Sequence, residues 1–230
     1  MAAYDLELLK EVEVVLFDCD NTLQLGDKQE LHARLGAIST RMCLGYSEEE
    51  IQVIGDRSDY REMRQLMVEN YNTLHPDADL SQDDFQAVNQ EVSGTFDNYF
   101  YLADHAKELL EGVKAKGKGL ALVTTRGTNS IDRLLEMHGI GNYFDAVVNR
   151  DDCPERKPHP APIQLALKHL RVEDPSSAVY IGDKQEDDVA GGNNAGTLTV
   201  LVNEVIDPSG SQPTYHFRSL KPLLTVFAEN

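Results

Sequence analysis

Short apolar runs alternate with apolar stripes of helical spacing along two parts of the chain. The runs are rich in β-branched residues and are bounded by polar residues, which is typical of buried strands. They lie at residues 14–17, 119–123, 146–148, 178–181 and 198–202. Strands and helices that alternate in this way favour a parallel sheet covered by helices on both faces. We therefore predict an α/β fold with a Rossmann-like parallel sheet flanked by helices.

The stripes between these runs place apolar residues three and four positions apart, so each predicts a helix with one buried face. They cover residues 106–113, 131–138, 163–170 and 189–195. We expect the tail from residue 207 to form a loop and then a short helix around residues 219–227. The run at 198–202 is therefore the last strand that the sequence predicts.

Residues 28–100 show helical spacing and no apolar run that predicts a buried strand. Ser47 is followed by a row of glutamates, which is typical of the start of a helix. A crossover between parallel strands needs only about a dozen residues, so a segment of this length is predicted to be an inserted domain. The predicted boundaries are a core domain at 1–22 and 102–230 and an α-helical domain at 23–101.

The charge and the cysteines limit the partners and the compartment. The net charge of the 230-residue chain is −18, and nucleic acids and anionic membranes bind basic surfaces, so we expect neither as a partner. No stretch approaches the roughly 20 apolar residues that span a bilayer, and no export signal is visible. The cysteines are scattered and odd in number, which favours a reducing compartment. We expect a cytoplasmic protein that is a monomer or a small homo-oligomer.

Two acids follow the first apolar run directly. Asp18 and Asp20 are one residue apart, and side chains at i and i+2 of an extended backbone point to the same side. Both can therefore project from the carboxyl end of a buried strand, where open α/β sheets bind ligands. Close carboxylates repel one another, and a divalent cation would offset that cost. Cys19 points to the opposite face and is expected to pack. The alternative interpretation of the two acids is an acidic turn.

A hydroxyl and an ammonium group that suit phosphate occur further along the chain. Thr124 ends the run at 119–123, and its hydroxyl, with N–H groups of the next turn, can hold a phosphoryl oxygen. A helix cap is the alternative role for this threonine. Lys157 lies in a loop stiffened by prolines, and a lysine is a natural counter-charge for phosphate.

Further acids follow the run at 178–181. Asp183 comes directly after a glycine that allows a tight turn, and its carboxylate can coordinate a metal. Asp187 and Asp188 lie at the start of the next predicted helix. Acids at this position also complement the helix dipole, so a purely structural role remains the alternative for either one.

In order and spacing, these segments resemble the four motifs of the haloacid dehalogenase-like (HAD) hydrolase superfamily. The matching residues are Asp18 to Thr22, Thr124, Lys157, and Gly182-Asp183 with Asp187 or Asp188. The segments at 157–162 and 188–196 are similar to the phosphoglycolate phosphatase-like branch. The inserted helical segment lies where that branch carries a helical cap domain.

The resemblance implies a Mg²⁺-dependent reaction at the first two acids. Asp18 would be the nucleophile, forming an aspartyl-phosphate, and would also bind Mg²⁺. Asp20 would protonate the leaving group, activate the hydrolytic water and offer its backbone carbonyl to Mg²⁺. Phosphoryl transfer needs charge neutralisation and positioning above all, which agrees with these roles.

The resemblance also assigns the binding residues. Thr124, with Thr125 beside it, and Lys157 would hold the phosphoryl oxygens. Asp183 would bind Mg²⁺ directly. An acid of the next helix would support the metal from behind, and here the candidates are Asp187 and Asp188. We favour Asp188, because it fits the register of the helix that follows.

The function implied is hydrolysis of a small phosphorylated metabolite. Asp20 argues against a dehalogenase, since dehalogenases of this superfamily lack that second acid. A phosphomutase of the β-phosphoglucomutase kind shares the same motifs, and a non-catalytic HAD-like binding protein is a further alternative. Phosphoglycolate, a nucleotide, a sugar phosphate and pyrophosphate all stay open as substrates. Arg57, Arg61 and Arg64 of the inserted segment could contact an anionic substrate, although a solvated helix face is the preferred interpretation.

Overall fold

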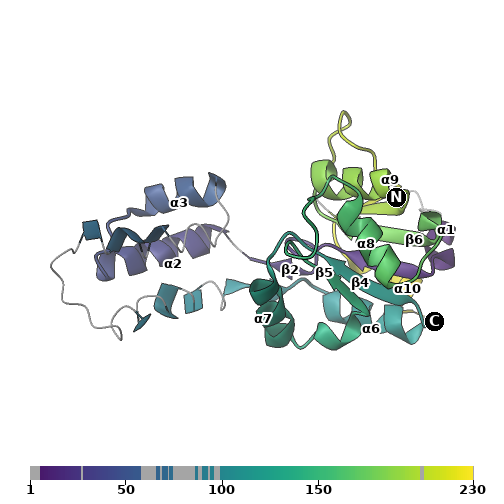
Figure 1. Ribbon diagram of the computed structural model, residues 1–230, viewed down its shortest axis with the longest axis horizontal. Coiled ribbons are helices and arrows are strands. Elements are labelled where there is room, and N and C mark those ends of the chain that lie inside the picture. Colours follow the sequence, from purple (N-terminus) through teal and green to yellow (C-terminus); the bar gives the residue numbers. More distant parts are fainter. Residues whose placement is uncertain are drawn as a thin grey trace. The chain divides into compact units, whose positions relative to one another are not determined.

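The computed structural model divides the chain into two compact units, which are considered separately (Figure 1). The first unit combines residues 1–25 with 102–230, and the second spans 26–101. The structure describes residues 6–26, 28–57, 66–67, 69–71, 73–74, 86–87, 90–92, 94–95, 99–202 and 205–229. None of the helices in these ranges is both long and apolar enough to cross a membrane.

The first unit is built on a six-stranded sheet with the order β5-β4-β1-β6-β7-β8. Every pair of neighbouring strands is parallel. The strands are β1 (Val14–Phe17), β4 (Gly119–Val123), β5 (Ala146–Val148), β6 (Ala178–Gly182), β7 (Leu198–Val202) and β8 (Tyr215–Phe217). The predicted parallel α/β sheet is therefore confirmed.

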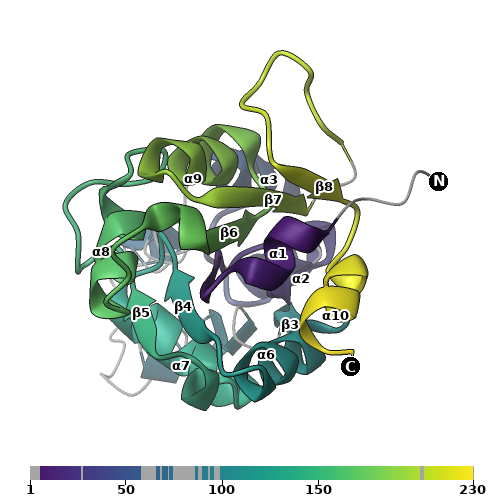
Figure 2. The ribbon, with the colours of Figure 1, turned by 90° about the vertical axis from the view of Figure 1, so that its right-hand side faces the viewer.

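Helices cover both faces of this sheet (Figure 2). One face packs against α1 (Glu7–Glu11), α6 (Ala106–Ala115), α7 (Thr128–His138) and α10 (Lys221–Phe227). The other face packs against α8 (Ala161–His169) and α9 (Ala190–Ala195). Short turns of 3₁₀ helix occupy Gly141–Tyr143 and Pro175–Ser177, and a π-helical turn at Gln185–Val189 leads into α9.

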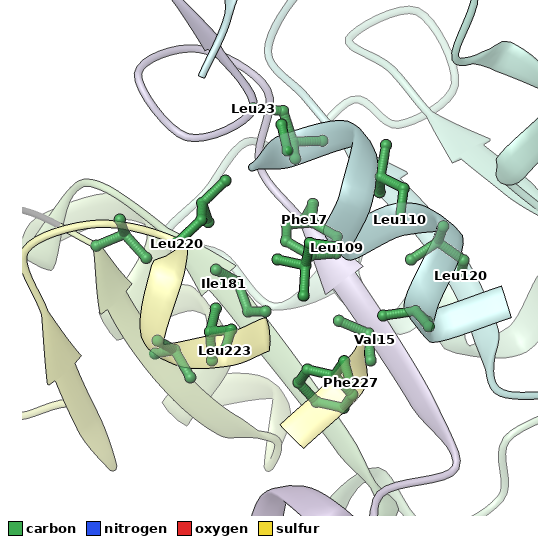
Figure 3. Close-up of a cluster of buried hydrophobic side chains, with 14 of the residues drawn as sticks. Val15, Phe17, Leu23, Leu109, Leu110, Leu120, Ile181, Leu220, Leu223 and Phe227 are labelled. Carbon is green, nitrogen blue, oxygen red and sulfur yellow. The ribbon is translucent and has the colours of Figure 1, made fainter. Parts of the chain in front are cut away.

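The residues of β1 show why the sheet is buried on both sides. Successive side chains of a strand point to opposite faces. Val15 and Phe17 accordingly join the apolar cluster under α6 and α10, whereas Val14 and Leu16 join the cluster under α8. Figure 3 shows Phe17 within the first cluster, among leucines of α6 and α10. A strand that is apolar at every position is stable only where helices cover both faces of the sheet. This agrees with the central position of β1.

The second unit has its own small core. It contains α2 (Lys28–Arg41) and α3 (Glu48–Arg57). Its buried apolar side chains are Leu31, Leu35, Ile38, Leu44, Ile51, Met67, Val92 and Tyr99. Helix α3 begins as predicted: the Ser47 hydroxyl accepts the Glu50 N–H at 3.2 Å, and the Glu50 carboxylate accepts the Ser47 N–H at 2.9 Å. This reciprocal pairing satisfies two N–H groups that the first helical turn leaves without partners.

Three short strands were not predicted. Strand β8 lies in the tail that the sequence predicts to be a loop, so that prediction was wrong at residues 215–217. Three residues are too few for a periodic signal, and β8 forms only because β7 offers a free edge beside it. A second, two-stranded sheet pairs β2 (Gln24–Leu25) with β3 (Tyr101–Leu102).

Candidate active site

The candidate site lies where the direction of the chain across the sheet reverses. From β1 the chain goes to β4 and β5 on one side, and then returns to β6 and β7 on the other side of β1. Ligands of open α/β sheets bind at such a reversal, beyond the carboxyl ends of the strands. The first residues past two of these ends stay attached to the sheet. Asp18 donates its N–H to the Ile181 carbonyl at 2.8 Å, and Thr124 donates to the Val148 carbonyl at 2.9 Å.

Lys157 lies at the centre of the site, and its side chain is only 4% exposed. Its Nζ is 2.6 Å from a carboxylate oxygen of Asp18 and 2.6 Å from one of Asp188. It also donates to the Tyr180 hydroxyl at 2.8 Å. Burial alone would lower the pKa of Lys157, but Tyr180, Asp18 and Asp188 outweigh it and raise the pKa well above its usual value. These three neighbours therefore favour the charged form of the buried lysine.

Of the two acids left open by the sequence, Asp188 is the one that faces the site. It is 2% exposed, and its second carboxylate oxygen accepts the N–H groups of Asp183 and Lys184 at 3.1 and 3.0 Å. The Asp187 side chain is 41% exposed and lies 3.9 Å from the Lys184 ammonium. Gly182 explains the close approach of Asp188, because a Cβ atom on this glycine would lie 2.4 Å from the Asp188 side chain.

Asp183 is buried beside Asn21. The Asn21 side chain donates a hydrogen bond to the Asp183 carboxylate, and this contact lowers the pKa of the acid. Burial acts more strongly in the opposite direction, so the pKa of Asp183 is raised to about 6. Asn21 itself adopts the left-handed conformation with φ of 58°. Asparagine tolerates this region better than most residues, which gives a physical reason for its place in the turn after Asp20.

The carboxylates of Asp18, Asp183 and Asp188 crowd together. One oxygen of each lies within 4.8 Å of the others, and all three residues are buried. Burial is the main reason that the pKa of Asp18 is raised to about 8, with Lys157 opposing it and Asp188 reinforcing it. One ammonium group cannot neutralise three carboxylates. Oxygen donors with excess negative charge are the ligands that Mg²⁺ prefers, so the residues present fit a divalent cation.

Asp20 is placed differently from Asp18. Its carboxylate is 39% exposed and is gripped by Arg126, which the sequence analysis did not single out. Arg126 Nε donates to the two carboxylate oxygens at 3.1 and 2.9 Å, and Nη2 donates to one of them at 2.6 Å. Gln24 adds an amide donor at 3.1 Å. Burial would lower the pKa of Arg126, but its hydrogen bonds to the Asp20 carboxylate and the charge of that group raise it.

The candidate phosphate residues differ in exposure. Thr124 is 6% exposed, and its hydroxyl accepts the Arg126 N–H at 3.2 Å. Thr125 is exposed. Thr124, Thr125 and Lys157 all line one small recess, together with residues that follow β5. The side chains of Arg57, Arg61 and Arg64 lie outside the part of the chain that the structure describes.

Three contributors to the site were not predicted from the sequence: Arg126, Tyr180 and Asn21. Tyr180 is fully buried in β6, and its hydroxyl donates to the Val123 carbonyl at 3.2 Å. A tyrosine within an apolar run needs a hydrogen-bond partner, and that requirement was the available signal. Arg126 gave a similar signal, as a cation three residues past the end of β4. Cys19 packs in the apolar core as expected.

The chain is similar to characterised and solved proteins over nearly all of its length. A phosphoglycolate phosphatase of Vibrio parahaemolyticus is 30% identical over 235 residues, covering 95% of this chain and 97% of that protein. Pyrophosphatase PpaX of Bacillus velezensis is 38% identical over 123 residues, which is 52% of this chain and 56% of that protein.

Solved structures agree with this placement. A HAD phosphatase from Thermococcus onnurineus aligns with a TM-score of 0.66 and 25% identity, covering 93% of this chain and 97% of that one. A predicted phosphoglycolate phosphatase from Haemophilus somnus aligns with a TM-score of 0.65 and 25% identity, covering 94% and 98%. The family model described as haloacid dehalogenase-like hydrolase matches residues 15–202. This chain therefore belongs to the haloacid dehalogenase-like hydrolase family.

Proposed function

We propose that this protein is a Mg²⁺-dependent phosphatase that hydrolyses a small phosphomonoester through an aspartyl-phosphate on Asp18. The observation that carries the proposal is the buried contact between Asp18 and Lys157, with Asp183 and Asp188 beside them. A carboxylate held against a fixed cation is positioned to meet a phosphoryl group, whose charge the same cation neutralises. The relatives named phosphoglycolate phosphatase and pyrophosphatase support a phosphoryl substrate.

The cation would be held by the side chains of Asp18 and Asp183 and by the backbone carbonyl of Asp20. When bound, Mg²⁺ would neutralise charge on the phosphoryl group and on the crowded carboxylates. Asp188 supports this set from behind, because it anchors both Lys157 and the N–H group of Asp183. The Asp187 side chain is 41% exposed and lies near Lys184, which supports Asp188 as the acid proposed for that role.

The protein groups account for both halves of the reaction. A carboxylate oxygen of Asp18 forms a bond to phosphorus while the bond to the leaving oxygen breaks, and Asp20 gives that oxygen its proton. Water then attacks the phosphorus of the aspartyl-phosphate and passes its proton to Asp20, which restores both acids. Lys157 and the hydroxyl of Thr124 hold the phosphoryl oxygens. The buried position of Lys157 keeps its Nζ in one place throughout.

The helical unit at 26–101 is proposed to select the substrate, as the cap domain does in the branch that this chain resembles. The net charge of −18 opposes nucleic acid as a substrate and is compatible with a small metabolite.

Hydrolysis of p-nitrophenyl phosphate tests the proposal. We expect turnover that requires Mg²⁺ and falls by about 10³-fold or more in Asp18→Asn, because the nucleophile is lost. Asp132→Asn is the matched control, since Asp132 is an exposed acid of α7. Absence of Mg²⁺-dependent turnover by the wild type, across a broad panel of phosphate esters, would reject the proposal. Accumulation of phosphorylated enzyme with sugar phosphates would instead indicate a phosphomutase.

A further inference from the structure

The ion pair between Arg126 and Asp20 engages both oxygens of the Asp20 carboxylate. Arg126 uses Nε and Nη2 on the Asp20 carboxylate and Nη1 on the Ser130 hydroxyl, which is 3.0 Å away in the first turn of α7. Both oxygens of Asp20 accept at least one N–H group, and Gln24 adds a further donor. A carboxylate bound in this way acts only as an acceptor. To hand a proton to a leaving group, Asp20 has to leave the guanidinium.

Separation of Asp20 from Arg126 costs free energy, mainly because the Arg126 guanidinium is the more buried of the two charges. The Arg126 side chain is 17% exposed, whereas that of Asp20 is 39% exposed. Asp20 can therefore turn to water or substrate, but the guanidinium keeps its charge in a largely buried position. A buried charge that loses its partner is strongly destabilising. A second anion that takes the place of the Asp20 carboxylate would offset this cost.

The position of Arg126 indicates where that anion comes from. Arg126 follows Thr124 by two residues at the end of β4, and β4 pairs directly with β1, which carries Asp18. Its guanidinium lies against Asp20, the acid proposed to protonate the leaving group, whereas Lys157 lies against Asp18. We therefore expect Lys157 to bind the phosphoryl group and the Arg126 guanidinium to lie on the side of the leaving group.

We propose that Arg126 selects substrates whose leaving group carries its own oxyanion, which takes the guanidinium from Asp20 and frees that acid for proton transfer. This inference rests on the proposed phosphatase function and narrows its substrate class. A guanidinium fork binds carboxylates and phosphates equally well in a bidentate manner. Phosphate esters of hydroxy acids and pyrophosphate both meet the requirement. Esters of neutral alcohols do not.

A pair of isosteric esters tests the selection. 2-Phosphoglycolate and 2-phosphoglycolamide differ only in the charge of the leaving group. In the wild type we expect kcat/KM to be about 30-fold or more higher for the carboxylate, as for a charged hydrogen-bonded pair. In Arg126→Gln we expect this preference to shrink to about 3-fold or less, because the fork is gone. Pyrophosphate compared with methyl phosphate is the second arm, and it distinguishes a phosphate from a carboxylate as the preferred anion.

Controls separate selection from a structural role. Arg133→Gln removes an exposed arginine of α7 and should keep the wild-type preference. Arg126→Lys keeps the charge without the fork, and we expect an intermediate preference. Equal losses for both esters of a pair in Arg126→Gln would show that Arg126 only positions Asp20, and would overturn the inference.

The substrate preference of the wild type also tests the inference, even if the substituted proteins do not fold. Turnover of p-nitrophenyl phosphate without a preference for the charged member in either pair would overturn the inference and leave the phosphatase proposal intact. Failure of the phosphatase proposal itself would be seen as absence of Mg²⁺-dependent turnover of every ester, p-nitrophenyl phosphate included.

Discussion

The ammonium group of Lys157 lies 2.6 Å from the Asp188 carboxylate, although the two residues are 31 positions apart in the chain. Asp188 also accepts the N–H of Asp183, so one side chain connects the proposed phosphate-binding lysine with a proposed metal ligand. Breaking a buried ion pair leaves a charge without compensation, and its cost exceeds that of any exposed pair.

Asp188→Asn should therefore damage both stability and activity, whereas Asp187→Asn should damage neither. We expect the free energy of unfolding to fall by about 3 kcal/mol in Asp188→Asn. We expect kcat/KM to fall by about 10²-fold, because Lys157 and Asp183 lose a shared support. Denaturant melts and steady-state kinetics check both values. Equal effects of the two substitutions would contradict the arrangement, since the Asp187 side chain is 41% exposed.

Tyr180→Phe should loosen Lys157 without removing any charge. The hydroxyl accepts from Lys157 at 2.8 Å and donates to the Val123 carbonyl at 3.2 Å, in a fully buried position. Loss of these bonds should lower the free energy of unfolding by about 1–2 kcal/mol. Tyr99→Phe is the matched control, because the Tyr99 hydroxyl is buried with no hydrogen-bond partner among the described residues. A comparable loss in Tyr99→Phe would show that removal of any buried hydroxyl has the same effect.

The stability of the metal-free protein should fall as pH rises from about 4 to 8. Folding raises the pKa of Asp183 from 3.8 to about 6, and that of Asp18 to about 8. The folded state therefore binds protons that the unfolded state has lost, so the stabilisation present below the unfolded pKa disappears as pH passes the folded values. Binding of Mg²⁺ needs ionised carboxylates, so the stabilisation that it provides should grow over the same range.

Thermal melts between pH 4 and 9 test this, with a chelator and with Mg²⁺. The gap between the two melting temperatures should widen with pH. Asp183→Asn should flatten the chelator curve around pH 6, where the pKa of Asp183 lies. A gap that stays constant from pH 5 to pH 8 would show that these acids are already ionised without metal.

Asn21 should respond differently to alanine and to glycine. Its φ of 58° is costly for alanine and free for glycine. We expect Asn21→Ala to be about 1 kcal/mol less stable than Asn21→Gly. Both lose the amide that donates to Asp183, so both should bind Mg²⁺ less tightly than the wild type. Equal stability of the two variants in chemical denaturation would mean that the turn relaxes out of the left-handed region.

Much of the α/β architecture could be predicted because its strands are apolar on both faces. Residues 14–17 and 178–181 stand out for this reason, and both lie in the centre of the sheet. Strand β8 could not be predicted, since its three residues form a strand by pairing with β7 and show no periodic pattern of their own. The sequence favoured Asp188 through the register of the following helix but left Asp187 as an alternative, because both suit the start of a helix. The π-helical turn at Gln185–Val189 decides which of them is buried.

The residues that act through a partner were the hardest to predict. Arg126 and Asp20 are 106 positions apart, and neither local spacing nor composition indicates that they meet. In the sequence, Tyr180 cannot be distinguished from other aromatic residues of strands. Its contact with Lys157 is known only from the tertiary structure. Strand ends can be predicted from periodicity, but the pairing of side chains across loops depends on the tertiary structure.

The central place of β1 has a consequence for synthesis of the protein. Asp18 leaves the ribosome early, but its counter-charge and its acidic neighbours come from residues 157–188. Until those residues emerge, the nascent chain presents an apolar strand without its neighbour β6 and an acid without a cation. Folding of this unit should therefore wait until residues 157–188 have emerged.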